Sequence, residues 1–569
     1  MISLNETGFL PEADKLAVSD HDGTFRIIDD NEKKQVDVNI SVTEAGFDET
    51  AGSDIYRLDF SEVRDPGIYH IESADGDCSS TFKVEPHVYR SLKNALLKFF
   101  FFQRCGCALY EKHAGPFKRG VCHSKTVKVP GTDKELPIKK GWHDAGDYGR
   151  YSSAGAVAVA HMLYAFELFP EAFNEAVNIP ESGNGIPDVL NECRYELDFL
   201  SEMQDEDGGV HHKVTSRVFC GFVMPEEDTF DQELFSVTSM STADFAAVMC
   251  IASRVYEPYD PSFARDCLHQ AYLAGQWLME NPENTDFRNP EGCNTGEYED
   301  GSDVDERMWA FAELLRTDHY IGHEHDRSFA GADQQVQSRQ DRYLAHLMTE
   351  MDLYIKDHPH SDGRSTDDGF GWQDVSSLGA LAVVFDPDNY AGEEVRGKML
   401  SMLCKRADAF VAMQDDGYPL SMTDKDYVWG SNMVVANRAN VLIITSLALK
   451  KGEEVPEKCQ RYEEAAMNQV HYILGMNAIR TSYVTGFGEH PFNNPHNRVT
   501  ASDNIDRPFP GMLSGGPCKL LLDEEIKKSA DETTPAQKCY KDHYMSYSTN
   551  EIAIYWNSSL LFSVAFFDR

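Results

Sequence analysis

A change in sequence pattern near residue 88 constrains most strongly how this chain of 569 residues can fold. Before it, short β-branched and aromatic runs alternate with Asp- and Gly-containing turns roughly every ten residues, as in small antiparallel sandwiches. These runs are KLAVSD, TFRIIDD, VDVNISVT, IYRLDF, GIYHIES and STFKVE. After Tyr89 the pattern changes to long helical periodicities. We therefore expect two domains, a β-sandwich over residues 1–88 and a helical domain over residues 89–569.

The helical part contains too many predicted helices for a simple bundle and no fixed short repeat that would indicate a solenoid. A closed ring of helix hairpins, an (α/α)6 toroid, fits the number of helices, so we expect a mainly α protein. Functional residues would then lie in the loops at one end of the ring. The predicted helices are Ser91–Lys112, Ser153–Leu168, Ile186–Met203, Thr242–Tyr256, Pro261–Met279, Val304–Leu315, Gln335–Ile355, Ala391–Met413, Asn432–Lys450, Glu457–Leu474 and Ser548–Phe567.

Charge and missing motifs exclude several classes of function. The chain has 94 acidic and 52 basic side chains, a net charge of −42, which disfavours nucleic acid and anionic membranes as partners. The longest apolar runs, such as Leu96–Phe102 and Ser559–Phe567, are shorter than the ~20 residues that span a bilayer. Walker, GxGxxG, HExxH and GxSxG motifs are absent from the sequence, so nucleotide, zinc-protease and serine-hydrolase chemistry lack support.

The ligand is therefore expected to be neutral or a cation. Several long loops mix carboxylates and amides with aromatic rings, a combination that suits sugars because apolar ring faces stack and hydroxyls need planar polar partners. The loops are Lys139–Tyr151, Gln204–Val214, Asn289–Glu306, His358–Asp374, Tyr483–Thr500 and Tyr540–Asn557.

Two short segments carry candidate catalytic carboxylates. In Trp142–Tyr148 the side chains of Asp144 and Asp147 flank a small Ala-Gly pair, so both could reach one water; a surface turn or half of a calcium loop are the alternatives. In Ser548-Thr549-Asn550-Glu551 the residues alone favour a helix N-cap. The apolar surroundings of Glu551 would raise its pKa and suit it to general-acid catalysis.

Candidate metal ligands form two groups. Thirteen cysteines is an odd number, and their scatter favours reduced thiols with a metal site over a disulfide framework. Two thiols and two imidazoles make a closed tetrahedral zinc set: Cys105, Cys122, His123 and His143, with Cys107 and His113 as competing ligands and a buried free thiol as the alternative. Gly301–Glu306 and Thr366–Asp374 are acidic loops that could bind calcium or simply be solvated. The run His323–Asp326 is unassigned.

Taken together, these residues resemble glycoside hydrolase family 9, the inverting β-1,4-glucanases, in the subgroup with an N-terminal immunoglobulin-like domain. The resemblance covers nearly the whole chain and is most specific in two C-terminal motifs. One departure occurs at His490, where the family usually has Asn, Lys or Arg. The motifs are Tyr540-x-Asp542-x4-Tyr547-x3-Glu551-x-Ala553-x3-Asn557-Ser558 and Ser482-x-Val484-Thr485-x2-Gly488 followed by Pro495-His496-x-Arg498.

The resemblance implies a role for each matching residue. Asp147 is the expected general base, Asp144 helps to hold the attacking water, and Glu551 is the expected general acid. An inverting pair lies roughly 6.5–9.5 Å apart, so the fold must bring these distant loops together. The remaining implied residues are His496, Arg498 and Tyr547 for substrate, Cys105, Cys122, His123 and His143 for structural zinc, and Asp305, Glu306 and, with an irregular local match, Asp374 for calcium.

The expected activity is endo-hydrolysis of cellulose-type β-1,4-glucans by a glycosidase of the cellulase class, with no organic cofactor and as a monomer. Two alternatives remain: an exo-acting β-glucosidase or glucosaminidase on short oligosaccharides, and a non-catalytic glycan-binding protein. The resemblance implies secretion. The start of the chain shows no basic segment followed by an apolar one, as a signal peptide would, so a mature or an intracellular form is expected.

Overall fold

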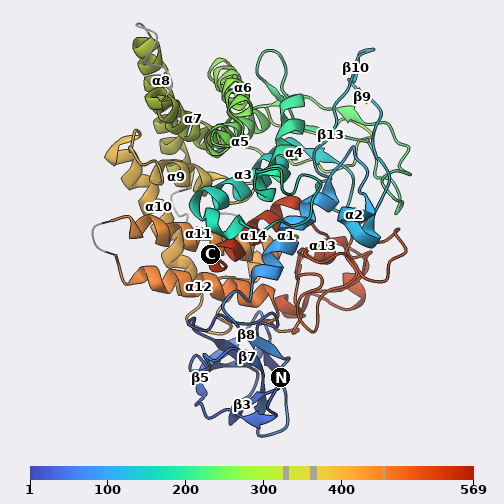
Figure 1. Cartoon of the computed structure of the whole chain (residues 1–569), viewed down its shortest axis with the longest axis vertical. Coiled ribbons are helices and arrows are strands. Elements are labelled where there is room, and N and C mark those ends of the chain that lie inside the picture. Colours follow the sequence, from blue (N-terminus) through green and yellow to red (C-terminus); the bar gives the residue numbers. More distant parts are fainter. Residues whose placement is uncertain (325–331, 359–367, 453–454) are drawn as a thin grey trace. The chain divides into compact units, whose positions relative to one another are not determined.

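The computed structural model describes residues 1–324, 332–358, 368–452 and 455–569 (Figure 1). It divides into two compact units: unit 1 combines Met1–Phe99 with Ala407–Arg569, and unit 2 is Phe100–Arg406. The β-sandwich thus clusters with the C-terminal part of the chain. The domain boundary at residues 88/89 stays a prediction.

The N-terminal part of unit 1 is a β-sandwich of two antiparallel sheets, with strand orders β1-β2-β6-β5 and β4-β3-β7-β8. Alternation along each strand sets which side chains face the core: in β7, Tyr69 and Ile71 are buried. The strands are β1 (Ile2–Ser3), β2 (Leu16–Ser19), β3 (Phe25–Asp29), β4 (Lys34–Gln35), β5 (Ser41–Asp48), β6 (Ser53–Asp59), β7 (Gly67–Ser73) and β8 (Phe82–Val84). The run VDVNISVT is only partly a strand, because β5 begins at Ser41 and the preceding Val36, Val38 and Ile40 pack on the core from an irregular segment.

Unit 2 is mainly helical. Within it α5 packs against α3, α6 and α7, and α7 packs against α8 and α9, as the green helices of Figure 1 show in part. Helices α1 and α10 each cross the division between the units. The helices are α1 (Arg90–Gln103), α2 (Glu111–Ala114), α3 (Ser152–Leu168), α4 (Asp188–Glu202), α5 (Ser239–Tyr256), α6 (Pro261–Glu280), α7 (Val304–Glu324), α8 (Ala332–Asp357), α9 (Ser376–Val384) and α10 (Gly392–Ala412).

Short strands accompany the helices of unit 2. They form a mixed sheet of order β10-β9-β14-β13-β11 and a pair β12-β15, and β11 leads directly into α3. These strands hold the loop before α3 in place. Their bounds are β9 (Val127–Lys128), β10 (Glu135–Leu136), β11 (Arg150–Tyr151), β12 (Val210–His211), β13 (Lys213–Thr215), β14 (Glu233–Leu234) and β15 (Val237–Thr238).

The C-terminal helices of unit 1 are α11 (Ser431–Lys450), α12 (Lys458–Ile473), α13 (Tyr547–Asn550) and α14 (Ile554–Phe567). The predicted helix Ser548–Phe567 is wrong in one respect, because Glu551 is extended (φ −66°, ψ 160°) and separates α13 from α14. Ser548 and Thr549 lie inside α13, so they are not N-caps. Helix α11 is long and apolar enough to cross a membrane, but 89% of its apolar window is buried inside the protein, as in the core helix of a soluble protein.

Polar contacts join the β-sandwich to the C-terminal part of unit 1. Arg57 donates from Nη2 to the Gln414 carbonyl at 2.6 Å, and the backbone N–H of Tyr418 donates to Asp48 Oδ2 at 2.9 Å. Buried Asn5 donates to His471 Nδ1 at 3.0 Å. These contacts explain why sequence-distant parts form one unit.

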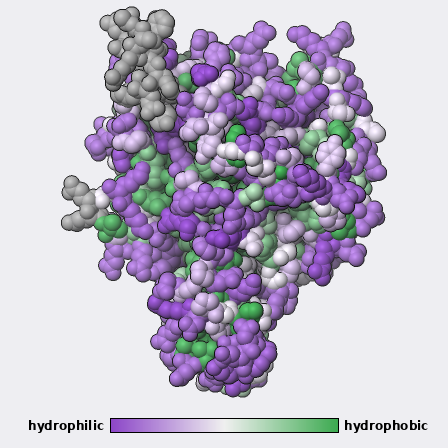
Figure 2. All heavy atoms as spheres, in the orientation of Figure 1, coloured by the Kyte–Doolittle hydropathy of each residue, from purple (hydrophilic) through white to green (hydrophobic). Residues whose placement is uncertain are grey.

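Hydrophilic side chains predominate on the face of the protein shown in Figure 2, where hydrophobic residues form separate patches. On this face, therefore, mainly polar and charged side chains are in contact with solvent.

Candidate active site and metal centres

Backbone hydrogen bonds fix the acidic loop of unit 2 that carries Asp144 and Asp147. His143 N–H donates to the Gln103 carbonyl at 2.7 Å, and Gln103 Nε2 donates back to the His143 carbonyl at 2.9 Å. Asp144 N–H donates to the Gly149 carbonyl at 2.9 Å and closes the turn. The loop is therefore tied at both ends rather than left as a mobile surface turn.

The two carboxylates of this loop differ in their partners. Tyr298 donates its hydroxyl proton to Asp144 Oδ2 at 2.5 Å, whereas buried Asp144 Oδ1 has no hydrogen-bond partner among the described residues. Asp147 Oδ2 accepts from Gly149 N–H at 3.0 Å. Burial raises the pKa of Asp144 well above its usual value, Tyr298 opposes this rise and Asp147 adds to it. A buried carboxylate oxygen without a partner is a place for an ordered water.

Aromatic rings lie beside these carboxylates. Tyr298 is 4.6 Å from Tyr151 and 4.8 Å from Trp372, measured between ring centroids, and the hydroxyl of Tyr151 is 3.5 Å from Asp147 Oδ2. Sequence reasoning did not single out these three residues, although it placed them in the loops rich in aromatic rings and carboxylates. Rings and carboxylates together can bind a sugar and act on it.

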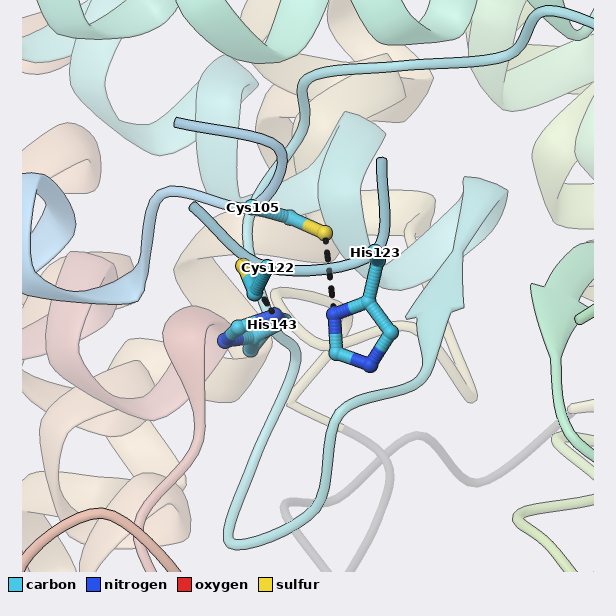
Figure 3. Close-up of side chains that lie close together, drawn as sticks. All are labelled: Cys105, Cys122, His123 and His143. Atoms are coloured by element: carbon cyan, nitrogen blue, oxygen red, sulfur yellow. Dashed lines mark hydrogen bonds between the residues drawn. The ribbon is translucent and has the colours of Figure 1, made fainter. Parts of the chain in front are cut away.

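The four predicted zinc ligands come together in unit 2 (Figure 3). Their ligand atoms all lie within 4.8 Å of one another, with Cys105 Sγ 3.6 Å from His123 Nδ1 and Cys122 Sγ 3.8 Å from His143 Nε2. Burial lowers the pKa of His143 to about 4, so this imidazole is neutral, as a metal ligand must be. The four residues form a group that could hold a metal ion.

The two competing ligands lie outside this group. His113 is instead 3.1 Å from the side-chain oxygen of Asn178, and Cys107 is not part of the cluster. His143 directly precedes Asp144, so an ion bound by the cluster would fix one end of the acidic loop. The unassigned run His323–Asp326 and the start of Thr366–Asp374 include residues outside those described.

The predicted calcium ligands Asp305 and Glu306 lie in the first turn of α7, and both are buried. Val375 N–H donates to Asp305 Oδ2 at 2.8 Å, which brings Asp374 into the same neighbourhood. Both oxygens of Asp374 already accept hydrogen bonds, from Tyr354 at 2.8 Å and from Ser376 N–H at 2.9 Å. Of the three predicted ligands, Asp374 therefore has the least need of a cation to satisfy its oxygens.

A carboxylate that sequence reasoning missed, Asp244 on α5, belongs to the same cluster. Neither its oxygens nor those of Glu306 have hydrogen-bond partners among the described residues, and both side chains are fully buried. Burial raises the pKa of Glu306, and Asp305, Asp300 and Asp244 raise it further. Buried carboxylates without partners need either protons or a cation, and hard oxygen ligands favour calcium.

In unit 1, the structure places Glu551 beside His496. The two residues form a parallel bridge, His496 N–H donates to the Asn550 carbonyl at 2.8 Å, and Gly515 N–H donates to the Glu551 carbonyl at 2.8 Å. His496 Nδ1 lies 2.7 Å from the Tyr544 carbonyl. Because a carbonyl can only accept, Nδ1 carries the ring proton.

The defined positions of the acid-bearing motif have structural roles around Asn550. Tyr540 donates to Asn550 Oδ1 at 2.5 Å, and Asn550 Nδ2 donates to Asp542 Oδ1 at 2.9 Å. Asp542 also accepts from the backbone N–H groups of Asn493 and Asn494, each at 2.9 Å. This network ties the backbone before Glu551 to the segment that leads to His496.

Tyr547 is 6.2 Å from His496 and 5.2 Å from Trp429 between ring centroids. Arg498 is nearly buried in the same loop. Trp429 is 45% exposed, which makes its ring available to a ligand, and sequence reasoning did not name it. A single large aromatic residue between predicted helices carries too weak a pattern to be selected.

The comparisons with known proteins decide the family. A model described as Glycosyl hydrolase family 9 matches residues 89–564, and one described as the cellulase N-terminal ig-like domain matches residues 1–77. The chain belongs to glycosyl hydrolase family 9. The predicted family, and with it the glycoside hydrolase class, is confirmed.

Similar proteins agree with this family assignment. A cellodextrinase of Butyrivibrio fibrisolvens is 38% identical over 99% of both chains, and endoglucanase D of Acetivibrio thermocellus is 31% identical over 100% of this chain and 83% of its own. The solved structure of a single-mutant thermostable endoglucanase from Alicyclobacillus acidocaldarius has a TM-score of 0.87 at 32% identity and covers 100% of this chain and 99% of that one. The family 9 hydrolase thus has the predicted fold, a barrel of the (α/α)6 type preceded by an immunoglobulin-like β-sandwich.

Proposed function

We propose that this family 9 hydrolase is an endo-β-1,4-glucanase that cleaves cellulose-type glucans with inversion. The observation that carries the proposal is the acidic loop, where Asp144 Oδ1 is buried without a partner among the described residues while Asp147 lies in the same turn. One carboxylate can orient a water there while the other deprotonates it. The sequence resemblance supports the same assignment.

In the proposed reaction, Glu551 gives its proton to the glycosidic oxygen as the bond from that oxygen to the anomeric carbon breaks. Water attacks the anomeric carbon from the opposite face and passes a proton to Asp147. Asp144 orients the water. His496, Arg498 and Tyr547 bind the sugar at the cleavage point. The products are two shorter glucans, one with a new inverted anomeric centre.

Replacing each of the two proposed catalytic carboxyl groups by the corresponding amide tests this function. Asp147→Asn and Glu551→Gln should each lower kcat on soluble cellulose by roughly 10²–10⁴-fold while the circular dichroism spectrum stays unchanged. Asp133→Asn, in an exposed loop of unit 2, is the matched control and should keep full activity. Near-normal hydrolysis by either catalytic variant would refute the assignment.

A second candidate activity is exo-hydrolysis of short cello-oligosaccharides. The observation that favours it is the similarity to a cellodextrinase over 99% of both chains. The two modes separate when viscosity loss is compared with reducing-sugar release on soluble cellulose: endo-cleavage lowers viscosity early, and exo-cleavage releases sugar with little loss of viscosity. The first outcome supports the proposal, and the second replaces it with the oligosaccharide activity.

We infer a structural zinc ion at Cys105, Cys122, His123 and His143. Two sulfur and two nitrogen ligands, buried and close together, suit tetrahedral zinc with no position left for water. When bound, zinc would cross-link the loops that carry its ligands and hold His143 next to Asp144. It takes no part in the reaction.

Calcium is proposed at the carboxylate cluster of Asp305, Glu306 and Asp374, with Asp244 added from the structure. The fit depends on the buried oxygens of Glu306 and Asp244, which lack partners among the described residues. Calcium would neutralise their charge and join α5 to α7. We further propose that the enzyme needs no organic cofactor, acts as a monomer and binds neither nucleic acid nor membranes.

A further inference from the structure

Three metal-ligating side chains converge on the outer face of the β-sandwich, within unit 1. His70 and Glu72 alternate with buried residues along β7, and Cys78 lies opposite Glu72 across the hairpin that follows. One ligand atom from each of the three lies within 4.8 Å of the others. Cys78 is exposed, and the side chains of His70 and Glu72 are 17% and 26% exposed, so an ion can reach the group from solvent.

The neighbours of the cluster orient its ligand atoms. Asp30 Oδ2 lies 3.0 Å from His70 Nδ1, and Glu72 Oε1 lies 3.3 Å from His70 Nε2. Arg26 holds the other oxygen of Glu72, with Nε at 2.8 Å and Nη2 at 2.6 Å from Oε2. Glu72 Oε1 is therefore turned toward the imidazole. Asp30 lies at the other ring nitrogen of His70, where a carboxylate commonly supports a histidine that binds a metal.

His70 Nε2 and Glu72 Oε1 lie 3.3 Å apart, close enough for both atoms to bind one ion. A neutral imidazole that donates from Nδ1 to Asp30 has a lone pair on Nε2, which then faces the lone pairs of Glu72 Oε1. Two acceptors at 3.3 Å repel each other unless a cation lies near both. A metal ion bound to both atoms would remove this repulsion, and Cys78 offers a thiol within 4.8 Å of them as the third ligand.

We propose that His70, Glu72 and Cys78 form a binding site for Zn²⁺ or a similar transition-metal ion, with Asp30 as the supporting carboxylate. One sulfur, one nitrogen and one oxygen ligand exclude calcium and magnesium, which bind oxygen. Three protein ligands leave one position for water. The ion joins β7 to the hairpin that follows it and stabilises the β-sandwich, in a place separate from the four-ligand cluster of unit 2.

The test uses the full chain, stripped of metal by a chelator and then saturated with zinc. Bound zinc is counted by elemental analysis in the parent, in Cys78→Ser and in His70→Gln, with Cys404→Ser on α10 as the matched control. We expect each cluster variant to bind one zinc fewer per chain than the parent and the control to match the parent. Because only the difference in zinc content between parent and variant is used, the result does not depend on how fully the four-ligand cluster of unit 2 is occupied.

Two further measurements use only the parent protein and the variants already described. Zinc should slow alkylation of Cys78 in the parent, read by mass spectrometry of its peptide, by at least about tenfold, because a metal-bound thiolate is a poor nucleophile. Cobalt in place of zinc should give a thiolate charge-transfer band that weakens in Cys78→Ser and not in Cys404→Ser. Equal zinc content in parent and cluster variants, or alkylation of Cys78 that zinc leaves unchanged, overturns the proposal.

Discussion

At the residue scale, Asp144 and Asp147 show how one turn gives two carboxylates different properties. Asp144 is buried and held by Tyr298, and burial raises its pKa. Asp147 is held by the backbone of its own loop. A general base and a water-orienting carboxylate need such unequal surroundings, because two equivalent neighbouring carboxylates would compete for one proton.

Tyr298 is the residue that opposes the raised pKa of Asp144. In Tyr298→Phe the hydrogen bond to the carboxylate is lost, so the pKa of Asp144 rises further and the ionised form is lost at higher pH as the solution is acidified. The acid limb of the kcat/KM profile should therefore move to higher pH. At its acid end activity should fall roughly tenfold, as expected for a hydrogen bond to a charged group.

The pH profile of Tyr298→Phe is compared with that of Tyr272→Phe, which removes a partly buried hydroxyl that donates to Asp318 elsewhere in unit 2. The control should leave the acid limb in place. If the limb of Tyr298→Phe does not move, or moves to lower pH, Asp144 does not act as an ionised carboxylate in the rate-limiting step.

At the element scale, the proposed zinc site and the acidic loop are directly connected, because His143 and Asp144 are adjacent in the chain. Cys122→Ser should lose one zinc per chain and lower the melting temperature, since metal binding energy contributes to folding. Cys107→Ser, at the competing thiol outside the cluster, should keep its zinc. Zinc content is measured by elemental analysis, and zinc retained by Cys122→Ser would place the ion elsewhere.

A second connection between elements is a hydrogen-bonded contact that joins the β-sandwich to the segment carrying His496. Buried Glu6 accepts from His490 N–H at 2.8 Å, lies 2.8 Å from His490 Nδ1 and accepts from Ser80 at 2.6 Å. His490, the residue that departs from the family pattern, thus has a partner in the sandwich. Six residues further along the chain, the same segment places His496 beside Glu551.

Glu6→Gln should weaken this contact because an amide nitrogen would face a donor. We expect a loss of about 1–3 kcal/mol in the free energy of unfolding, the cost of leaving a buried polar group unsatisfied, together with a raised KM. Glu12→Gln is the control, because the exposed pair of Glu12 with Arg64 contributes little. Urea unfolding and steady-state kinetics read both effects. Equal stability of the two variants would contradict the structural role of Glu6.

The elements differ in how far the sequence predicts them. Amphipathic helices such as α4 and α12 have one apolar face, so periodicity located them within a few residues. Helix α9 was missed because all nine of its residues are buried and SSLGALAVV therefore shows no periodicity. The break at Glu551 was missed for a related reason, since the apolar run after it continues the helical pattern and tertiary contacts with His496 and Gly515 decide the backbone there.

The sequence predicts those residues of the candidate site that belong to recognisable motifs, and it does not predict the others. The four Cys and His residues that come together in unit 2 could be singled out because thiols and imidazoles are rare and chemically specific. Asp244 was not found, because a single aspartate on the apolar helix α5 reads as a surface position until its complete burial is seen. Tyr298 was missed because nothing in its own segment indicates that it reaches Asp144.

At the scale of the whole molecule, the sequence order and the compact units differ. Residues Met1–Phe99 group with Ala407–Arg569, and the side chains responsible, such as Arg57 and Asp48, look in the sequence like ordinary surface residues. The net charge of −42 also divides once the structure is known. A few buried carboxylates belong to the acidic loop and to the proposed calcium site, and most of the other described acidic side chains are at least partly exposed.

The most direct test of the account follows the anomeric configuration of the first product. Proton NMR during hydrolysis of a cello-oligosaccharide distinguishes the α and β anomers before mutarotation mixes them. Inversion through Asp147 and Glu551 predicts that the α anomer appears first and that Glu551→Gln forms almost no product over the same time. Initial formation of the β anomer would contradict the central claim.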